Sequence, residues 1–237
     1  MILIKPKQRL YIPGITIISK KSASSGGSGS NNWWNNNGAI SGCICAYAAK
    51  GAADLASSYI NLANPGTYNA SPGVAPIFSG ADGWTFNGST QYLTTGITPS
   101  NNQAWSIIAR FSDVPATATN RCLIGSAGPG AAAPYFGLIP RWSDGNAYYL
   151  NSGFLSKTPK ANGVMAFAGN VAYHNGSAES GTITTVAGTP YTLFIAARNE
   201  GGMAAAFLSG KIQALAIYST TLTAGEVATI TTAIQAL

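Results

Sequence analysis

Charged side chains are scarce in this sequence of 237 residues, at 8% of the total, whereas about a quarter is usual for a globular domain. Only seven residues are acidic, and no two of them stand two or four positions apart. A retaining glycosidase needs two carboxyl groups about 5 Å apart, which on one β-strand requires that spacing. The local form of such a pair is absent, and we expect no catalytic carboxylate and no enzymatic activity.

Histidine and cysteine are also rare, with one and three residues. The one histidine, His174, directly precedes the turn dipeptide Asn175-Gly176, and no Gly-x-Ser-x-Gly motif accompanies it. Cys43 and Cys45 stand two positions apart, which on a regular strand places both side chains on one face and makes a bridge between them strained. No second pair supplies a zinc-site spacing, and calcium usually takes several carboxylates. We therefore expect three reduced cysteines, no metal ion and no cofactor.

Long apolar runs are also missing. The longest early apolar stretch, residues 11–18, contains Pro13 and Gly14 and is far too short to cross a bilayer. The apolar run at residues 2–4 is broken by Lys5 and Pro6, which does not fit a secretory signal. We expect no membrane partner.

Positive charge is concentrated at the N-terminus. The first fifty residues hold six basic residues and no acidic one, while the other seven basic residues balance the seven acids, so this segment carries the whole net charge of +6. Residues 22–32 (SASSGGSGSNN) have the composition of a flexible linker. A basic arm can bind an acidic protein surface or nucleic acid; a solvated tail is the other interpretation. We expect the arm to anchor the chain to another protein and not to nucleic acid. The anchoring residues would be Lys5, Lys7, Arg9, Lys20 and Lys21.

Beyond residue 33, short apolar runs alternate with clusters of Gly, Pro and Asn, which is typical of an all-β chain. Asn87-Gly88, Asp144-Gly145 and Asn175-Gly176 favour the positive φ angles of tight hairpins that join neighbouring runs. In the run 105–111 apolar residues alternate, but Ile108 falls on the opposite face, so both faces of this strand are expected to be covered. No long helices separate the runs, which excludes a parallel α/β fold.

The end of the chain predicts one short helix. Thr223 and Glu226 have the spacing of a capping box, and Leu222 and Val227 that of a hydrophobic staple. β-branched residues would also suit a strand, but the cap favours a helix packed on the sheets. Its apolar stripe would consist of Val227, Ile230, Ile234 and Leu237.

Several stretches resemble laminin-G-like, concanavalin-type domains. GWTFNGSTQYLTTGI (83–97) with WSIIARFS (105–112) is similar to that family's opening hairpin, F-[DN]-G-x-x-x-Y-[LV], and to its next strand. AYHNGS (172–177) resembles a later hairpin, and GKIQALAIYSTTLTAGEVATI (210–230) resembles the ending. Residues 48–78 resemble the front end of such domains in tailed-phage structural proteins. The resemblance implies a two-sheet antiparallel jelly roll, a fold that hosts lectins, glycoside hydrolases, adhesion modules and virion proteins.

Together these features predict an all-β chain. Residues 1–37 would form an extended basic arm with a Gly/Ser/Asn linker, and residues 38–237 a laminin-G-like (concanavalin-like) jelly-roll β-sandwich that ends in a short helix. The resemblance implies a non-enzymatic structural protein of a bacteriophage virion, either for capsid decoration or associated with the tail. Its partners would be other virion proteins and copies of itself as lattice neighbours, and it would reach the virion by assembly in the host cytoplasm.

The alternative is a lectin-like, carbohydrate-binding module on a phage fibre or a bacterial surface protein, with a cell-surface glycan as its partner. Such sites combine aromatic side chains with a few placed polar groups. Because tryptophans often cover a core or a protein contact instead, the same residues are candidates for either role. A sugar site would expose Trp142, whereas a subunit contact would bury it, and the low surface charge favours the contact. The candidate residues are Trp142, Asp144, Asn146 and Tyr148, and separately Trp33 and Trp34.

Overall fold

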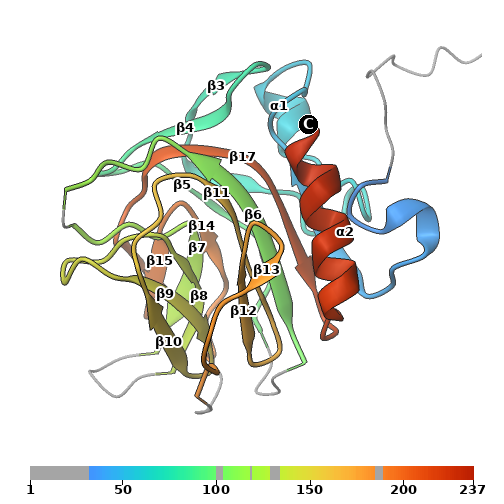
Figure 1. The fold of residues 1–237 in the computed structure, drawn as a ribbon. Helices are drawn as coiled ribbons and strands as arrows, with labels where there is room; N and C mark the ends of the chain where they lie inside the picture. The colour runs from blue at the N-terminus through green and yellow to red at the C-terminus, as the bar shows by residue number, and fades with distance from the viewer. Residues whose placement is uncertain (1–31, 100–103, 118, 129–133, 185–188) are drawn as a thin grey trace, which may run out of the picture.

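The computed structural model describes residues 32–99, 104–117, 119–128, 134–184 and 189–237. Two antiparallel β-sheets pack face to face, and the C-terminal helix lies against the outer face of the first sheet (Figure 1). The predicted two-sheet antiparallel sandwich with its C-terminal helix is confirmed. The predicted anchoring residues of the arm, Lys5, Lys7, Arg9, Lys20 and Lys21, lie outside the described residues.

The first sheet has eight strands, with the order β13-β12-β11-β6-β17-β4-β3. Its longest strand, β17, serves two neighbours on one side: its first half pairs with β4 and its second half with β1. The bounds are β1 Cys43–Ala48, β3 Ile77–Ser79, β4 Gly83–Asn87, β6 Ser106–Ser112, β11 Gly163–Ala168, β12 Val171–His174, β13 Ser177–Ala178 and β17 Ser209–Tyr218.

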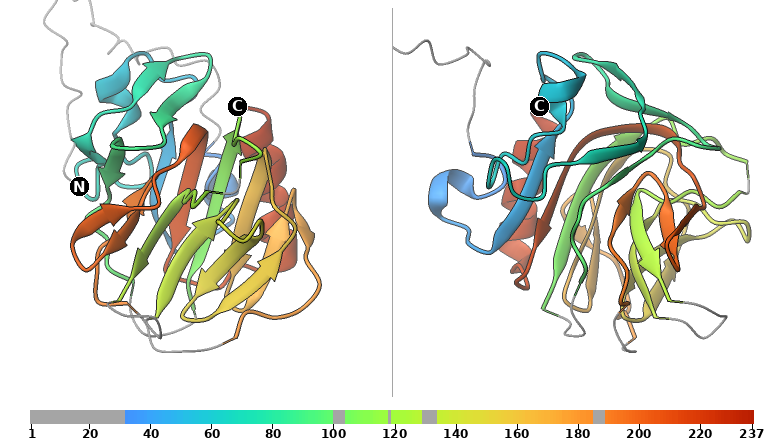
Figure 2. Two further views of the ribbon diagram at one scale, coloured as in Figure 1. Left: turned by 90° about the vertical axis from the view of Figure 1, so that its left-hand side faces the viewer. Right: turned by 180° about the vertical axis from the view of Figure 1, so that it is seen from behind.

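The second sheet has nine strands, with the order β10-β9-β8-β7-β14-β5-β2. In addition β15 pairs with β7 in parallel, and β16 pairs with β15. In the left panel of Figure 2 this sheet faces the viewer and the C-terminal helix lies behind it. The bounds are β2 Ser71–Val74, β5 Tyr92–Thr94, β7 Ile124–Ala127, β8 Tyr135–Ile139, β9 Ala147–Asn151, β10 Phe154–Lys157, β14 Phe194–Ile195, β15 Arg198–Glu200 and β16 Met203–Ala205.

The C-terminal helix, α2 (Ala224–Gln235), begins at the predicted cap. The backbone N–H of Glu226 donates to Thr223 Oγ1 at 3.3 Å, and the backbone N–H of Thr223 donates to Glu226 Oε2 at 2.7 Å. Val227, Ile230 and Ile234 are buried as the apolar stripe requires, whereas Leu237 lies beyond the end of the helix and is only partly buried. Two shorter helical segments, η1 (Asn36–Gly38) and α1 (Leu55–Ser58), flank β1 in the chain.

The molecule has two main apolar cores, one between the sheets and one beneath α2. Strand β6 takes part in both, because its side chains alternate between the faces of the first sheet. Ile107 and Phe111 point into the core between the sheets, and Ile108 points into the core beneath α2. The prediction that both faces of this strand are covered is confirmed.

Trp33 and Trp34 belong to the core beneath α2, where they are 4% and 8% exposed. Their rings meet edge to face, with centroids 5.8 Å apart. The hydroxyl of Tyr218 donates a hydrogen bond to the backbone carbonyl of Trp34 at 2.6 Å. Because both indoles fill a core, neither offers a face to a ligand, and the interpretation of this pair as a glycan platform is corrected.

Cys43 and Cys45 lie on opposite faces of β1, contrary to the expectation drawn from their spacing. Cys43 is paired with Tyr218 and Cys45 with Ile217, so Ile44 is an extra residue in this strand, a β-bulge. The bulge breaks the alternation, so that Cys45 packs between the sheets and Cys43 packs beneath α2. All three cysteines are free thiols.

The predicted turn dipeptides differ in what they connect. Asn175 and Gly176, with φ of 51° and 80°, close the tight hairpin between β12 and β13, as predicted. Gly88 also has a positive φ of 76°, but it leads from β4 in the first sheet to β5 in the second instead of closing a hairpin. The Asn87 side chain stabilises that crossing by accepting the backbone N–H groups of Ser89 and Thr90, each at 3.0 Å.

Candidate functional site

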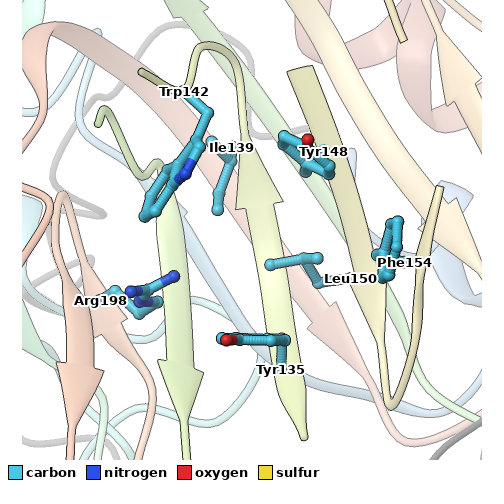
Figure 3. Close-up of a pocket in the computed structure, with 7 residues that line it drawn as sticks. All are labelled: Tyr135, Ile139, Trp142, Tyr148, Leu150, Phe154 and Arg198. Atoms are coloured by element: carbon cyan, nitrogen blue, oxygen red, sulfur yellow. The ribbon is translucent and has the colours of Figure 1, made fainter. Parts of the chain in front are cut away.

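A hollow of about 230 Å³ lies on the outer face of the second sheet (Figure 3). Four of its lining side chains are aromatic, two are aliphatic and one is an arginine, and we call it the aromatic hollow. They come from β8, β9, β10 and β15, and from the turn after β8. The lining residues are Tyr135, Ile139, Trp142, Tyr148, Leu150, Phe154 and Arg198.

Strand alternation places these side chains on the outer face. Phe136 and Leu138 of β8 and Tyr149 of β9 point into the core between the sheets, so their neighbours along each strand point away from it. β10 continues the pattern, because Phe154 is paired with Leu150. Phe154 is the most open member of the lining, with 54% of its surface exposed.

Two glycines face each other where β7 and β8 pair in the second sheet. Gly125 of β7 is paired with Gly137 of β8. Gly137 has φ of +144°, and a Cβ there would stand 2.0 Å from the carbonyl oxygen of Ile124. A Cβ at Gly125 would stand 2.9 Å from Cys122 Sγ. The backbone therefore admits only glycine at position 137.

Trp142 is held by a tight turn at the edge of the aromatic hollow. The backbone N–H of Gly145 donates to the carbonyl of Trp142 at 3.0 Å, and the N–H of Trp142 donates to the carbonyl of Asn146 at 2.7 Å. Gly145 supplies the positive φ, 86°, predicted for the dipeptide Asp144-Gly145. The Trp142 side chain is half-buried. It is thus neither exposed, as the sugar-site hypothesis expected, nor fully buried, as the subunit-contact hypothesis expected.

Asp144 stands beside the aromatic hollow with its carboxylate fixed by two hydrogen bonds. The hydroxyl of Tyr148 donates to Oδ2 at 2.5 Å, and the backbone N–H of Asn146 donates to Oδ1 at 2.9 Å. These donors, the Tyr148 hydroxyl foremost, hold the pKa of Asp144 below its ordinary value. The structure thus brings together Trp142, Asp144, Asn146 and Tyr148, and Asn146 takes part through its backbone and its side chain.

Arg198 closes the aromatic hollow on the side opposite Phe154. Its Nε donates to Glu200 Oε1 at 2.7 Å, and its Nη2 contacts the same oxygen. The guanidinium also lies over the rings of Trp142 and Tyr135, and the arginine side chain is only 13% exposed. Arg198 follows β14 on a short strand that pairs with β7 in parallel, and this pairing carries it to Trp142.

Sequence reasoning missed most of this lining. It singled out Trp142 and Tyr148 from their neighbours in the chain but did not find Arg198, which no local pattern marks. Outward alternation along the runs 135–139 and 147–150 was the available signal for the others. The lining residues that were not predicted are Tyr135, Ile139, Leu150, Phe154 and Arg198.

A second hollow of about 350 Å³ is polar and lies beside the end of α2. Arg110 Nη1 donates to the carbonyl oxygen of Ile234 at 3.0 Å. In the same hollow Gln213 Nε2 donates to Ser112 Oγ at 2.8 Å. The arginine satisfies a helix carbonyl that has no partner within the helix, so its role here is to fasten α2 to the first sheet.

The remaining candidate chemistry is sparse. Within the described ranges, no group of three or more His, Cys, Asp or Glu side chains is placed to hold a metal ion. His174 Nε2 lies 3.2 Å from the carbonyl oxygen of Asn162, and burial lowers the pKa of its imidazole. In the part of the chain that the structure describes, no helix is long and apolar enough to span a membrane.

No model of a known protein family matches the sequence, and neither does any curated protein. Solved structures do match its fold. Trypanosoma rangeli sialidase in complex with sialic acid has a TM-score of 0.56 at 13% identity, covering 80% of this chain and 32% of the sialidase. A mutant of the same sialidase that displays trans-sialidase activity has a TM-score of 0.55 at 12% identity, covering 82% and 33%.

Domain 4 of AbnA, a GH43 extracellular arabinanase from Geobacillus stearothermophilus in complex with arabinotriose, has a TM-score of 0.47 at 19% identity, covering 80% of this chain and 98% of that domain. The present chain spans about a third of the length of the sialidases that it matches. These three proteins do not bear on a virion role, so the phage function, the virion partners and the virion location stay predictions.

The expectation that the chain is not an enzyme is wrong, because the sialidases that share its sandwich are carbohydrate-active enzymes. That expectation rested on local patterns, a carboxylate pair on one strand and a nucleophile motif, whereas a fold brings side chains from separate strands together. At these identities the likeness shows the fold alone. The chain is a two-sheet β-sandwich of a kind found in carbohydrate-active proteins.

Proposed function

We propose that this protein binds carbohydrate in the aromatic hollow. The observation that carries the proposal is the placement of Trp142 and Tyr148 around an apolar floor, with the fixed carboxylate of Asp144 beside them. A sugar ring has apolar C–H faces and a rim of hydroxyl groups. Aromatic rings pack against the apolar faces, and a few fixed polar groups form hydrogen bonds with the hydroxyl groups.

The size of the aromatic hollow favours one sugar unit. Its volume of about 230 Å³ is below the ~300–1,000 Å³ of sites for drug-sized ligands, so a single ring fills it and the rest of a chain extends outside. The exposed ring of Phe154, 6.0 Å from the ring of Tyr148 between centroids, offers apolar surface next to it. Phe154 can therefore contact a second unit of a glycan chain, next to the unit that occupies the aromatic hollow.

The hollow is also preorganised, which lowers the entropy lost on binding. Trp142 is held by its turn and by Arg198, and Tyr148 is held by Asp144. The likeness to the sialidase fold and the laminin-G-like resemblance of residues 84–237 support the same class of ligand, because both folds include sugar-binding proteins.

The test is Trp142→Ala, assayed by glycan-array binding and by titration of the best array ligand. We expect a loss of affinity of at least about tenfold, since the ring forms a wall of the site. Tyr68→Ala is the control, because Tyr68 is an exposed aromatic (44%) that does not line the aromatic hollow.

Trp142→Phe guards against misfolding, as it keeps an aromatic ring at the site, and thermal unfolding of each variant confirms that the sandwich is intact. If the folded Trp142→Ala variant binds glycans like the wild type, or if the wild type binds no glycan on the array, the proposal is refuted.

A further inference from the structure

Arg198 is the one charged residue that lines the aromatic hollow within the described ranges. Its charge is already balanced, because Nε and Nη2 both contact Oε1 of Glu200. Arg141, next to Trp142 in the sequence, is not part of the lining. The hollow therefore has no uncompensated positive charge to offer a ligand.

Asp144 adds negative charge to the same surface. Its carboxylate accepts hydrogen bonds from Tyr148 and Asn146, and among the described residues it forms no ion pair with a basic side chain. Because the charges of Arg198 and Glu200 cancel, the carboxylate of Asp144 is the uncompensated charge among these three residues.

Arg198 nevertheless remains a hydrogen-bond donor. The structure records no partner for its Nη1 within the described part of the chain, whereas Nε and Nη2 contact Glu200. Figure 3 shows a terminal nitrogen of Arg198 directed into the aromatic hollow, between Trp142 and Tyr135. A guanidinium N–H in this position suits a neutral acceptor such as a hydroxyl, a ring oxygen or an amide carbonyl.

We propose, on the basis of the proposed function, that the aromatic hollow selects neutral sugar units over acidic ones. A carboxylate-bearing sugar would compete with Glu200 for Arg198 and would meet the negative charge of Asp144. Specificity of this kind arises from repulsion of the wrong ligand as well as from contacts with the right one. A neutral sugar keeps the stacking and the hydrogen bond and meets no such repulsion.

The experiment uses an array on which neutral oligosaccharides are printed beside their uronic-acid or sialylated counterparts, followed by titration of the strongest pair. We expect the neutral member to bind about fivefold tighter, the scale of a partly exposed charge interaction. In Glu200→Gln the ratio of the two affinities should shift toward the acidic member, because the charge of Arg198 is then uncompensated. Asp144→Asn, at an exposed carboxylate, should also reduce the preference for the neutral member over the acidic one.

Asp113→Asn is the control: Asp113 is an exposed acid paired with Lys211 at 2.9 Å, away from the aromatic hollow, and its replacement should leave the ratio unchanged. Equal or tighter binding of the acidic members, or a ratio that neither Glu200→Gln nor Asp144→Asn changes, overturns the selectivity and leaves carbohydrate binding standing. Failure of every member to bind refutes the proposed function itself.

Discussion

The guanidinium carbon of Arg198 lies 4.6 Å from the centroid of the Trp142 indole, over the ring. The same group lies 5.3 Å from the ring centroid of Tyr135. Such stacking is strongest when the cation is withdrawn from water, and this arginine is mostly buried. Arg198 therefore positions Trp142 as a wall of the aromatic hollow, and Glu200 in turn positions Arg198.

Replacing Arg198 by lysine should weaken both the site and the fold. The ammonium group has no planar face to lay on Trp142 and cannot reproduce the two-nitrogen contact with Glu200. We expect the free energy of unfolding to fall by about 0.5–1.5 kcal/mol, together with weaker glycan binding. Urea unfolding and ligand titration measure the two effects. Lys211→Arg, an exchange at an ion pair with exposed acids, is the control, and an Arg198→Lys variant equal to the wild type in both assays would contradict this role.

Thr223→Ala should destabilise the protein by about 0.5–2 kcal/mol, the usual effect of losing an N-cap. Alanine removes the Oγ1 acceptor that the backbone N–H of Glu226 uses, at the start of a helix that covers a core. Thr223→Ser retains that acceptor and serves as the matched control. The measurement is the urea concentration at the midpoint of unfolding, and the dependence of the unfolding free energy on urea concentration should not change. Equal midpoints for the two variants would show that this cap does not stabilise α2.

Stability should decrease at alkaline pH because buried thiols and phenols keep their protons in the folded state. Burial raises the pKa of Cys122 to about 12 and raises those of Cys45 and Tyr149 well above their ordinary values. In the unfolded chain the thiols ionise near their ordinary pKa of 9.0. The stabilisation is thus complete below about pH 9 and is lost as the pH rises toward 12, by up to about 1.4 kcal/mol per pH unit for each fully ionised thiol.

Urea unfolding at about pH 7.5, about pH 9 and about pH 10.5 measures this decline, because the three values span the ionisation of the unfolded thiols. Cys122→Ala removes one titrating group and should make the decline shallower than in the wild type. A free energy of unfolding that stays constant across the series would contradict the predicted ionisation of the unfolded state.

Several features of this protein were determined by the sequence alone, because they depend on residues close together in the chain. The cap at Thr223 and Glu226, the turn at Asn175-Gly176 and the two covered faces around Ile108 are of this kind. The all-β class followed from many such local signals repeated along the chain.

The tertiary structure alone decided what depends on strand pairing. A bulge at Ile44, visible only against β17, turned Cys43 and Cys45 to opposite faces, and packing beneath α2 buried Trp33 and Trp34. The order β8-β7-β15 brought Arg198 to Trp142. No local spacing encodes which strands become neighbours, since pairing is selected by the burial and hydrogen bonding of the whole sandwich, and for that reason the aromatic hollow appears only in the folded protein.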